Sequence, residues 1–145
     1  MSFESLALYE KDINQFRKGK RISKGGFGRV YEVTDIRTDK KYAAKVIECN
    51  DDKEECQKMI NREIEIMLRS NHATIIKLIG YSLKDFNNES NFTIIMELAK
   101  NGSLLNVIQS IQLSCGPKDY DSTCRQIILV GIARGMKYLH DRNII

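Results

Sequence analysis

Membrane spans, secretion signals and paired-cysteine motifs are all missing from this sequence. None of its apolar runs approaches the roughly 18 residues needed to cross a bilayer, and no apolar stretch behind a basic segment could act as a signal peptide. The four cysteines show no C-x-x-C spacing. They are Cys49, Cys56, Cys115 and Cys124. We therefore expect a protein of the reducing cytoplasm with no membrane partner.

Charge of one sign is not concentrated anywhere along the chain. The 23 lysines and arginines exceed the 19 acidic residues by four, but they are scattered and form no run of five. Nucleic-acid binding is therefore not indicated. With 145 residues, 42% of them hydrophobic, and no internal repeat, the chain is expected to be one compact unit or part of one.

A glycine turn lies between two strand patterns near the start of the chain. Gly25 and Gly28 bracket Gly26 and Phe27, so the backbone at the tip can adopt positive φ and approach a ligand closely. A strand pattern follows the turn, whereas a dinucleotide-binding G-x-G-x-x-G opens a helix, and the P-loop sequence G-x-x-x-x-G-K-[ST] does not occur. Together with Lys45 on the third predicted strand, the turn indicates a site that binds phosphate groups. An ordinary glycine-rich hairpin remains the alternative.

Hydrophobic periodicity predicts strands in the first part of the chain and helices in the last. Strands are expected at 18–24, 29–35 and 40–48, as an antiparallel meander, and at 75–83 and 92–98. Helices are expected at 51–70 with Asp51 or Asp52 as cap, at 103–111 with Ser103 as cap, and from Ser122 or Thr123 to about His140. The sequence Lys100-Asn101-Gly102 predicts the turn that separates the two parts.

The helix predicted at 51–70 carries a carboxylate on its apolar side. On a helical wheel, Glu63 is the centre of the apolar stripe, and the apolar side chains of that face lie within about 60° of it. They are Cys56, Met59, Ile60, Ile66 and Met67. A carboxylate buried without a partner is costly, so we expect a cation to approach it from the sheet that the helix covers.

Lys45 is the best candidate for that cation. It lies in the apolar stretch YAAKV, where a lysine is otherwise out of place. An ion pair between Lys45 and Glu63 would account for the presence of a charged residue in both apolar patterns. In the alternative interpretation, Lys45 points to solvent and Glu63 lies at a partly open helix edge. The glycine turn favours the pair, because a lysine one strand beyond the turn can reach phosphates held under it.

Taken in order, these segments resemble the N-terminal lobe of a eukaryotic protein kinase. Residues 22–30, ISKGGFGRV, are similar to its glycine-rich loop, Ala43-Ala44-Lys45 to its strand-three lysine motif, and Glu63 to its helix-C glutamate. Residues 71–81 resemble the lead into strand four, TIIMELAKNGSLLNVI resembles strand five, the hinge and helix D, and IARGMKYLHDRNII resembles helix E. The hinge and helix-E segments are most like those of tyrosine-kinase-like serine/threonine kinases.

The resemblance implies a fold, domain limits and an activity. The fold would be α+β, with a five-stranded antiparallel sheet and helix C in an N-lobe at about 16–98, a hinge at 99–102, and helices D and E of an incomplete C-lobe at 103–145. The implied ligand is ATP with Mg²⁺. The implied reaction of the complete domain is phosphoryl transfer to a protein Ser or Thr hydroxyl.

The resemblance also implies roles for individual residues. Gly25, Gly28 and neighbouring amides would cover the phosphates, and Lys45, oriented by Glu63, would pair with the α- and β-phosphates. Val30 and Ala43 would line the adenine pocket, Met96 would be the gatekeeper, and Glu97 to Ala99 would form the hinge. The full set of implied nucleotide-binding residues is Ile22, Ser23, Gly25, Gly26, Phe27, Gly28, Val30, Ala43, Lys45, Glu63, Met96, Glu97 and Ala99.

The sequence departs from the family pattern at the loop and at the catalytic motifs. Ser23 stands where the family usually has the first loop glycine, so closure over phosphate would be weaker. The motifs H-R-D-x-x-x-x-N and D-F-G, which would supply the base and the metal ligands, do not occur. We therefore expect a kinase sequence that is inactive by itself. A non-catalytic nucleotide-binding or interaction module and a non-functional gene fragment are the alternatives, and the protein substrate is not indicated.

Overall fold

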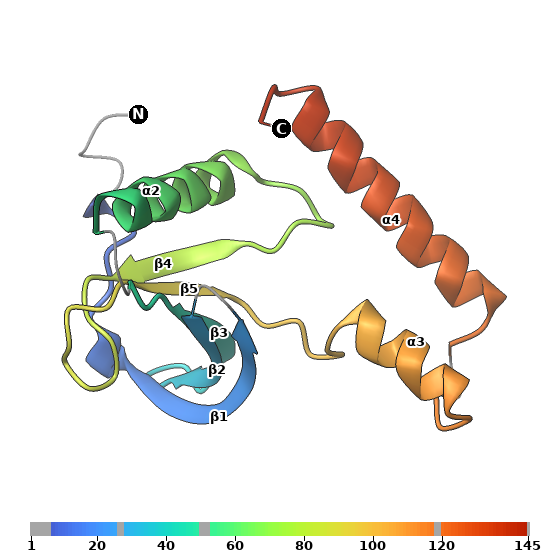
Figure 1. Cartoon of the computed structure of the whole chain (residues 1–145), viewed down its shortest axis with the longest axis horizontal. Coiled ribbons are helices and arrows are strands. Elements are labelled where there is room, and N and C mark those ends of the chain that lie inside the picture. The colour runs from blue at the N-terminus through green and yellow to red at the C-terminus, as the bar shows by residue number, and fades with distance from the viewer. Residues whose placement is uncertain (1–6, 26–27, 50–52, 118–119, 145) are drawn as a thin grey trace. The chain divides into compact units, whose positions relative to one another are not determined.

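The computed structural model describes residues 7–25, 28–49, 53–117 and 120–144. The chain divides into two compact units, one of residues 1–69 and 76–98 and the other of residues 70–75 and 99–145. The first unit holds all five strands and helix α2, and the second holds helices α3 and α4 (Figure 1). Gly26 and Phe27 of the predicted loop, and the predicted caps Asp51 and Asp52, lie outside the described residues.

A five-stranded antiparallel sheet with the order β1-β2-β3-β5-β4 forms the first unit, which confirms the predicted fold class. The strands are β1 (Phe16–Gly25), β2 (Gly28–Asp35), β3 (Lys41–Val46), β4 (Leu78–Ser82) and β5 (Thr93–Glu97). Strands β3 and β4 are shorter than predicted. Strand β4 begins late because residues 72–75 form a turn, in which the Ile75 amide donates to the His72 carbonyl over 3.1 Å.

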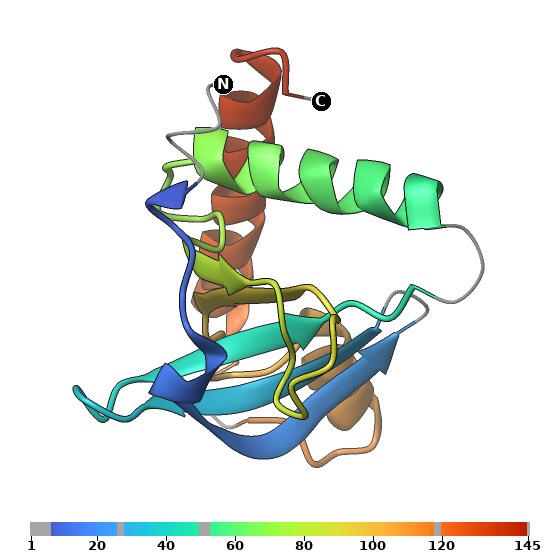
Figure 2. The same ribbon diagram turned by 90° about the vertical axis from the view of Figure 1, so that its left-hand side faces the viewer.

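Alternation along the strands builds two separate hydrophobic cores. Val33, Ala44 and Ile95 are fully buried on one face of the sheet. On the other face, Ile94 packs in a cluster with residues of helix α2 (Lys53–Arg69), which Figure 2 shows lying across the sheet. Because side chains of a strand alternate between faces, Ala44 and Lys45 necessarily face opposite cores.

Helix α2 has a buried stripe that differs from the predicted one. Cys56, Ile60 and Ile64, spaced by four residues, are its buried side chains among the described residues. Met59 is 37% exposed, and Glu63 lies at the margin of the stripe instead of at its centre. The helical wheel gave the wrong centre because Ile64, about 100° from Glu63 on the wheel, is buried. The centre of the buried stripe is therefore shifted from Glu63 toward Ile64.

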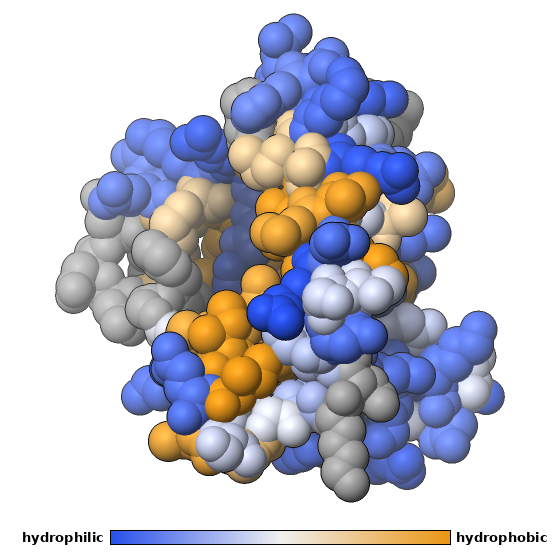
Figure 3. Space-filling view, turned by 90° about the vertical axis from the view of Figure 1, so that its right-hand side faces the viewer, coloured by the Kyte–Doolittle hydropathy of each residue, from blue (hydrophilic) through white to orange (hydrophobic). Residues whose placement is uncertain are grey.

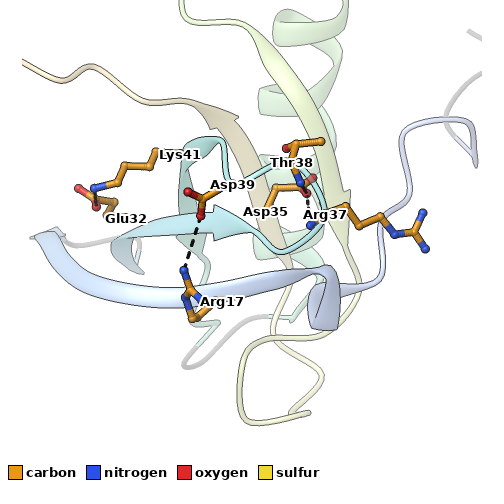
Figure 4. Close-up of polar contacts among 7 residues, drawn as sticks. All are labelled: Arg17, Glu32, Asp35, Arg37, Thr38, Asp39 and Lys41. Atoms are coloured by element: carbon orange, nitrogen blue, oxygen red, sulfur yellow. Dashed lines mark hydrogen bonds and ion pairs between the residues drawn. The ribbon is translucent and has the colours of Figure 1, made fainter.

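The β2–β3 turn is held by polar side chains (Figure 4). The Asp35 carboxylate accepts hydrogen bonds from the backbone amides of Arg37 and Thr38, at 2.8 and 2.9 Å. The bond from Thr38, followed by that from Arg37, lowers the pKa of Asp35 below its usual value. Beside the turn, Lys41 Nζ donates to Glu32 over 2.8 Å, and this contact lowers the pKa of the Glu32 carboxyl.

The segment before the sheet pairs with strand β4, which the sequence did not indicate. The Lys11 amide donates to the Tyr81 carbonyl over 2.7 Å, and the Tyr81 amide donates to the Tyr9 carbonyl over 2.9 Å. A Cβ atom at Gly80 would lie 2.5 Å from the Tyr9 carbonyl oxygen, so the close approach requires glycine there. The 3-10 helix η1 (Ile13–Gln15), capped by Asp12, then leads into β1.

Helices α3 (Leu104–Gln112) and α4 (Ser122–His140) make up most of the second unit. Ser103 caps α3 as predicted, but Asp121 caps α4 in place of the predicted Ser122 or Thr123, and its carboxylate accepts from the Cys124 amide over 2.7 Å. Many apolar side chains of these helices are exposed, and Figure 3 shows hydrophobic residues gathered on the surface in its view. Within the described ranges, no helix has the length and apolar character to cross a membrane.

Residues 70–75 belong to the second unit because they pack against α4. The Asn71 amide donates to the Tyr138 hydroxyl over 2.9 Å, and the His72 ring lies 5.0 Å from the Tyr138 ring. Gly135, buried in α4, leaves room for Thr74, whose hydroxyl oxygen would lie 2.8 Å from a Cβ atom at that position.

Candidate functional site

Lys45 and Glu63 form the ion pair that the sequence predicts. Lys45 Nζ lies 2.7 Å from each carboxylate oxygen of Glu63, and the two side chains are 22% and 34% exposed. The pair is therefore partly buried, not fully buried. An ammonium group has three donors, and the two that point at Glu63 leave one for a further anionic partner.

Strand pairing places the other predicted residues of the sheet beside this pair. Lys45 lies directly opposite Val30 on β2, and Ala43 lies opposite Met96 on β5. Residues directly opposite on antiparallel strands share a face, and so do residues two apart on one strand. Val30, Ala43, Lys45 and Met96 therefore lie on one face of the sheet, which is the face that α2 contacts.

The glycine hairpin joins β1 to β2, and its two described glycines differ. Gly28 has φ of +133°, and a Cβ atom there would lie only 2.0 Å from the Val46 carbonyl oxygen. Gly25 has no positive φ and nothing within 4 Å of a Cβ position, so only Gly28 of the two has the predicted backbone freedom. The hairpin is also tied to the end of β3 by an ion pair between Arg29 and Glu48.

Ile22 and Ser23, which precede the glycine turn, lie exposed on β1. Ile22 is 45% exposed, and Ser23 pairs with Val30 across the two strands. A shift in strand register falls between Arg21 and Ser23. The side chain of Ser23, where the family usually has glycine, therefore lies exposed on β1 directly after an irregularity in the strand pairing.

The predicted hinge residues fall in different units. Glu97 ends β5, where its amide donates to the Lys77 carbonyl over 2.9 Å and its carboxylate accepts from the Lys77 amide over 3.4 Å. Ala99 belongs to the second unit, where its carbonyl accepts from the Gly102 amide over 3.4 Å. The predicted turn at residues 100–102 is present, with Gly102 at φ +73°.

The site is adjoined by a disulfide that the sequence did not indicate. The sulfur atoms of Cys49 and Cys56 are bonded, linking the segment after β3 to the first turn of α2. Their spacing of seven residues matches no short cysteine motif, so only the fold could bring them together. Among the described residues, no group of three or more His, Cys, Asp or Glu side chains is placed to hold a metal ion.

These observations define a class of protein. An antiparallel sheet, a glycine hairpin and a strand-three lysine paired with a helix glutamate are the parts of a protein-kinase N-lobe. The sequence model of the protein kinase domain matches residues 16–145. The chain therefore belongs to the protein kinase domain family.

Several curated proteins are similar to this chain. It is 29% identical over 132 residues to MAP3K epsilon protein kinase 1 of Arabidopsis thaliana, covering 91% of this chain and 9% of that protein. It is 32% identical over 144 residues to Aurora kinase of Saccharomyces cerevisiae, covering 99% and 35%, and 33% identical over 138 residues to serine/threonine-protein kinase polo of Drosophila melanogaster, covering 92% and 22%. The chain thus spans a tenth to about a third of the length of these relatives.

Proposed function

We propose that this chain is the ATP-binding part of a serine/threonine protein kinase, which in the complete domain transfers a phosphoryl group from Mg-ATP to a protein hydroxyl. The observation that carries the proposal is the Lys45–Glu63 pair, with both contacts at 2.7 Å. Relatives whose names identify them as serine/threonine kinases support the same activity.

The residues of the first unit fit a nucleoside triphosphate. Lys45 has a donor left for the phosphates, and Glu63 fixes where its ammonium group lies. Val30, Ala43 and Met96 supply an apolar sheet face for the base. With Gly28 at φ +133°, the hairpin would offer backbone amides to the phosphates. Mg²⁺, when bound with ATP, would neutralise phosphate charge.

Three finer points belong to the proposal. Because the H-R-D-x-x-x-x-N and D-F-G motifs do not occur in the 145 residues, these residues bind nucleotide but do not transfer phosphate by themselves. The assignment to tyrosine-kinase-like kinases rests on the hinge and helix-E segments, and the names of the relatives do not support it. The cytoplasmic location rests on composition alone.

The experiment is thermal unfolding of the chain with and without Mg-ATP. Ligand at 100 times Kd stabilises by about 2.7 kcal/mol, which raises the midpoint by roughly 5–10 °C for a chain of this size. Lys45→Met removes a charge-assisted hydrogen bond, worth about 1.5–3 kcal/mol, so at the same ATP concentration the stabilisation falls to about 0.3–1.3 kcal/mol.

Lys84→Met is the matched control, because Lys84 is an exposed lysine of the same unit, between β4 and β5. It should leave the shift caused by Mg-ATP unchanged. A wild-type chain that shows no shift, or a Lys45→Met chain that shows the full shift, would contradict the proposed site.

A further inference from the structure

Cys49 and Cys56 differ in their access to solvent. Cys49, three residues beyond the end of β3, is exposed. Cys56 is 9% exposed and belongs to the hydrophobic cluster of Ile60 and Ile64. Their Cα atoms lie 5.9 Å apart, within the range that a disulfide requires without movement of the backbone. The exposed sulfur can therefore meet a soluble reagent first, and the buried sulfur is positioned to complete a bond to it.

The other two cysteines lie in the second unit and are not joined. Cys115 is exposed, with its thiol 3.3 Å from the Ser110 carbonyl, and Cys124 is half-buried in the first turn of α4. The bond is thus specific to one place in the fold, the junction between β3 and α2.

That junction is also the one bridged by the Lys45–Glu63 pair. Lys45 precedes Cys49 by four residues on the strand side, and Glu63 follows Cys56 by seven residues, which is two helical turns, on the helix side. Glu54 and Glu55, in the first turn, are exposed, whereas Cys56 is buried. A bond at Cys56 therefore anchors the start of the helix that carries Glu63.

We propose that Cys49 and Cys56 are a reversible redox modification site that takes a low-molecular-weight disulfide as its oxidant. The Cys49 thiolate attacks one sulfur of the reagent, forms a mixed disulfide and releases one reagent thiolate, which takes up a proton. The Cys56 thiolate then attacks the Cys49 sulfur and expels the second reagent thiolate. Two cysteine thiols are oxidised to one disulfide, and the reagent is reduced to two thiols.

The link closes a short loop and fixes the first turn of α2 against the end of β3. In the chain-entropy description, a loop of about eight residues changes the unfolding equilibrium constant by roughly 50-fold, so the oxidised chain should melt about 5–10 °C higher than the reduced chain. Because Glu63 lies on the anchored helix, the oxidised form should also bind Mg-ATP more tightly, by about 5-fold, which is the low end of typical coupling between two sites in one protein. This second effect rests on the proposed function.

The test uses the full chain with Cys115→Ser and Cys124→Ser, equilibrated in oxidised and reduced glutathione and examined by mass spectrometry and thermal unfolding. The chain should lose two hydrogen atoms without gaining glutathione, and should return to its reduced mass in excess reduced glutathione. Adding Cys56→Ser should trap one glutathionyl group on Cys49. Adding Cys49→Ser should leave the buried Cys56 largely unmodified.

Each alternative outcome has a definite consequence. A chain that accumulates glutathione at Cys49 despite an intact Cys56, or whose midpoint is the same in both redox states, would overturn the proposal. These readouts need no nucleotide, so they stand apart from the proposed function. If neither form binds Mg-ATP, the proposed function fails and the redox site stands. If both forms bind it equally, the coupling to Glu63 is wrong.

Discussion

Replacing Glu63 with glutamine tests the lysine–glutamate pair most directly. The substitution keeps the size of the side chain and an oxygen that can accept from Lys45 Nζ, but it removes the negative charge. We expect the chain to lose stability, because a partly buried ammonium group is left with a weaker, neutral partner.

The geometry of the pair sets the size of the loss. Both Nζ–Oε distances are 2.7 Å, but Lys45 and Glu63 remain 22% and 34% exposed. Exposed pairs contribute about 0.2–1 kcal/mol, and removing one partner of a fully buried pair costs about 3–5 kcal/mol. We therefore expect the free energy of unfolding to fall by about 1–2 kcal/mol, which lowers the midpoint by roughly 3–8 °C.

The assay is chemical and thermal unfolding of a double-mutant cycle that combines Glu63→Gln with Lys45→Met. Glu65→Gln is the matched control on the same helix, because its pair with Arg69 spans 3.6 Å and the side chains are 58% and 45% exposed. It should change stability by less than about 0.5 kcal/mol. In the cycle, the coupling energy between Lys45 and Glu63 should reach about 1 kcal/mol.

The result that refutes this reasoning is a coupling energy near zero. In that case Lys45 and Glu63 would contribute independently, and the short distances between them would have no energetic meaning. A loss for Glu63→Gln no larger than that for Glu65→Gln would refute it equally, since burial would then make no difference between the two carboxylates.

Gly28 and Asp85 are two further positions at which a single substitution should change stability. Gly28→Ala should destabilise the chain by about 3 kcal/mol or more, because φ is +133° and the new Cβ atom would meet the Val46 carbonyl. Gly25→Ala, with open space around it, should change stability by less than about 0.5 kcal/mol. Equal effects of the two substitutions in urea unfolding would contradict this prediction. Burial raises the pKa of Asp85, but hydrogen bonds from Asn91 and from the Asn87 and Glu89 amides outweigh it and lower that pKa below its usual value. The stability due to Asp85 is therefore present above the usual carboxyl pKa and is lost as the pH falls through the lowered pKa. The Asp85→Asn chain should melt at a lower temperature than wild type at neutral pH, and its midpoint should fall less on acidification. A midpoint that runs parallel to that of wild type across this pH range would be evidence against the role of Asp85.

Much of the sheet could be predicted because its strands bury both faces with different side chains. Val33 and Ala44 turn to one core, and Ile94 turns to the other, so the central strands appear in the sequence as short runs rich in apolar and β-branched residues, such as residues 93–96. The pairing of Tyr9 and Lys11 with Tyr81 could not be predicted, since backbone hydrogen bonds at a sheet edge require no side-chain pattern.

The lysine–glutamate pair of the candidate site was predicted because charged residues occur within apolar patterns, but such patterns do not determine which neighbouring side chains are buried. A lysine and a glutamate within apolar patterns identified Lys45 and Glu63, but the wheel alone could not say that Ile64 and not Met59 is buried. The cap Asp121 was missed because Ser122 and Thr123 are equally good capping residues by type. The bond between Cys49 and Cys56 depends on how α2 lies on the sheet, which neither spacing nor composition determines.

The two halves of the ion pair are held with unequal rigidity. Lys45 belongs to β3, which has hydrogen-bonded neighbours on both sides, with Val30 directly opposite on β2 and Ile94 on β5. Glu63 belongs to a helix that contacts the sheet through side chains, with Cys56 as the buried residue of its first turn. Backbone pairing on two edges resists displacement more than packing of a few side chains does. A perturbation at the β3–α2 junction therefore moves the carboxylate and leaves the ammonium group in place, so the orientation of the helix determines whether Lys45 has its partner.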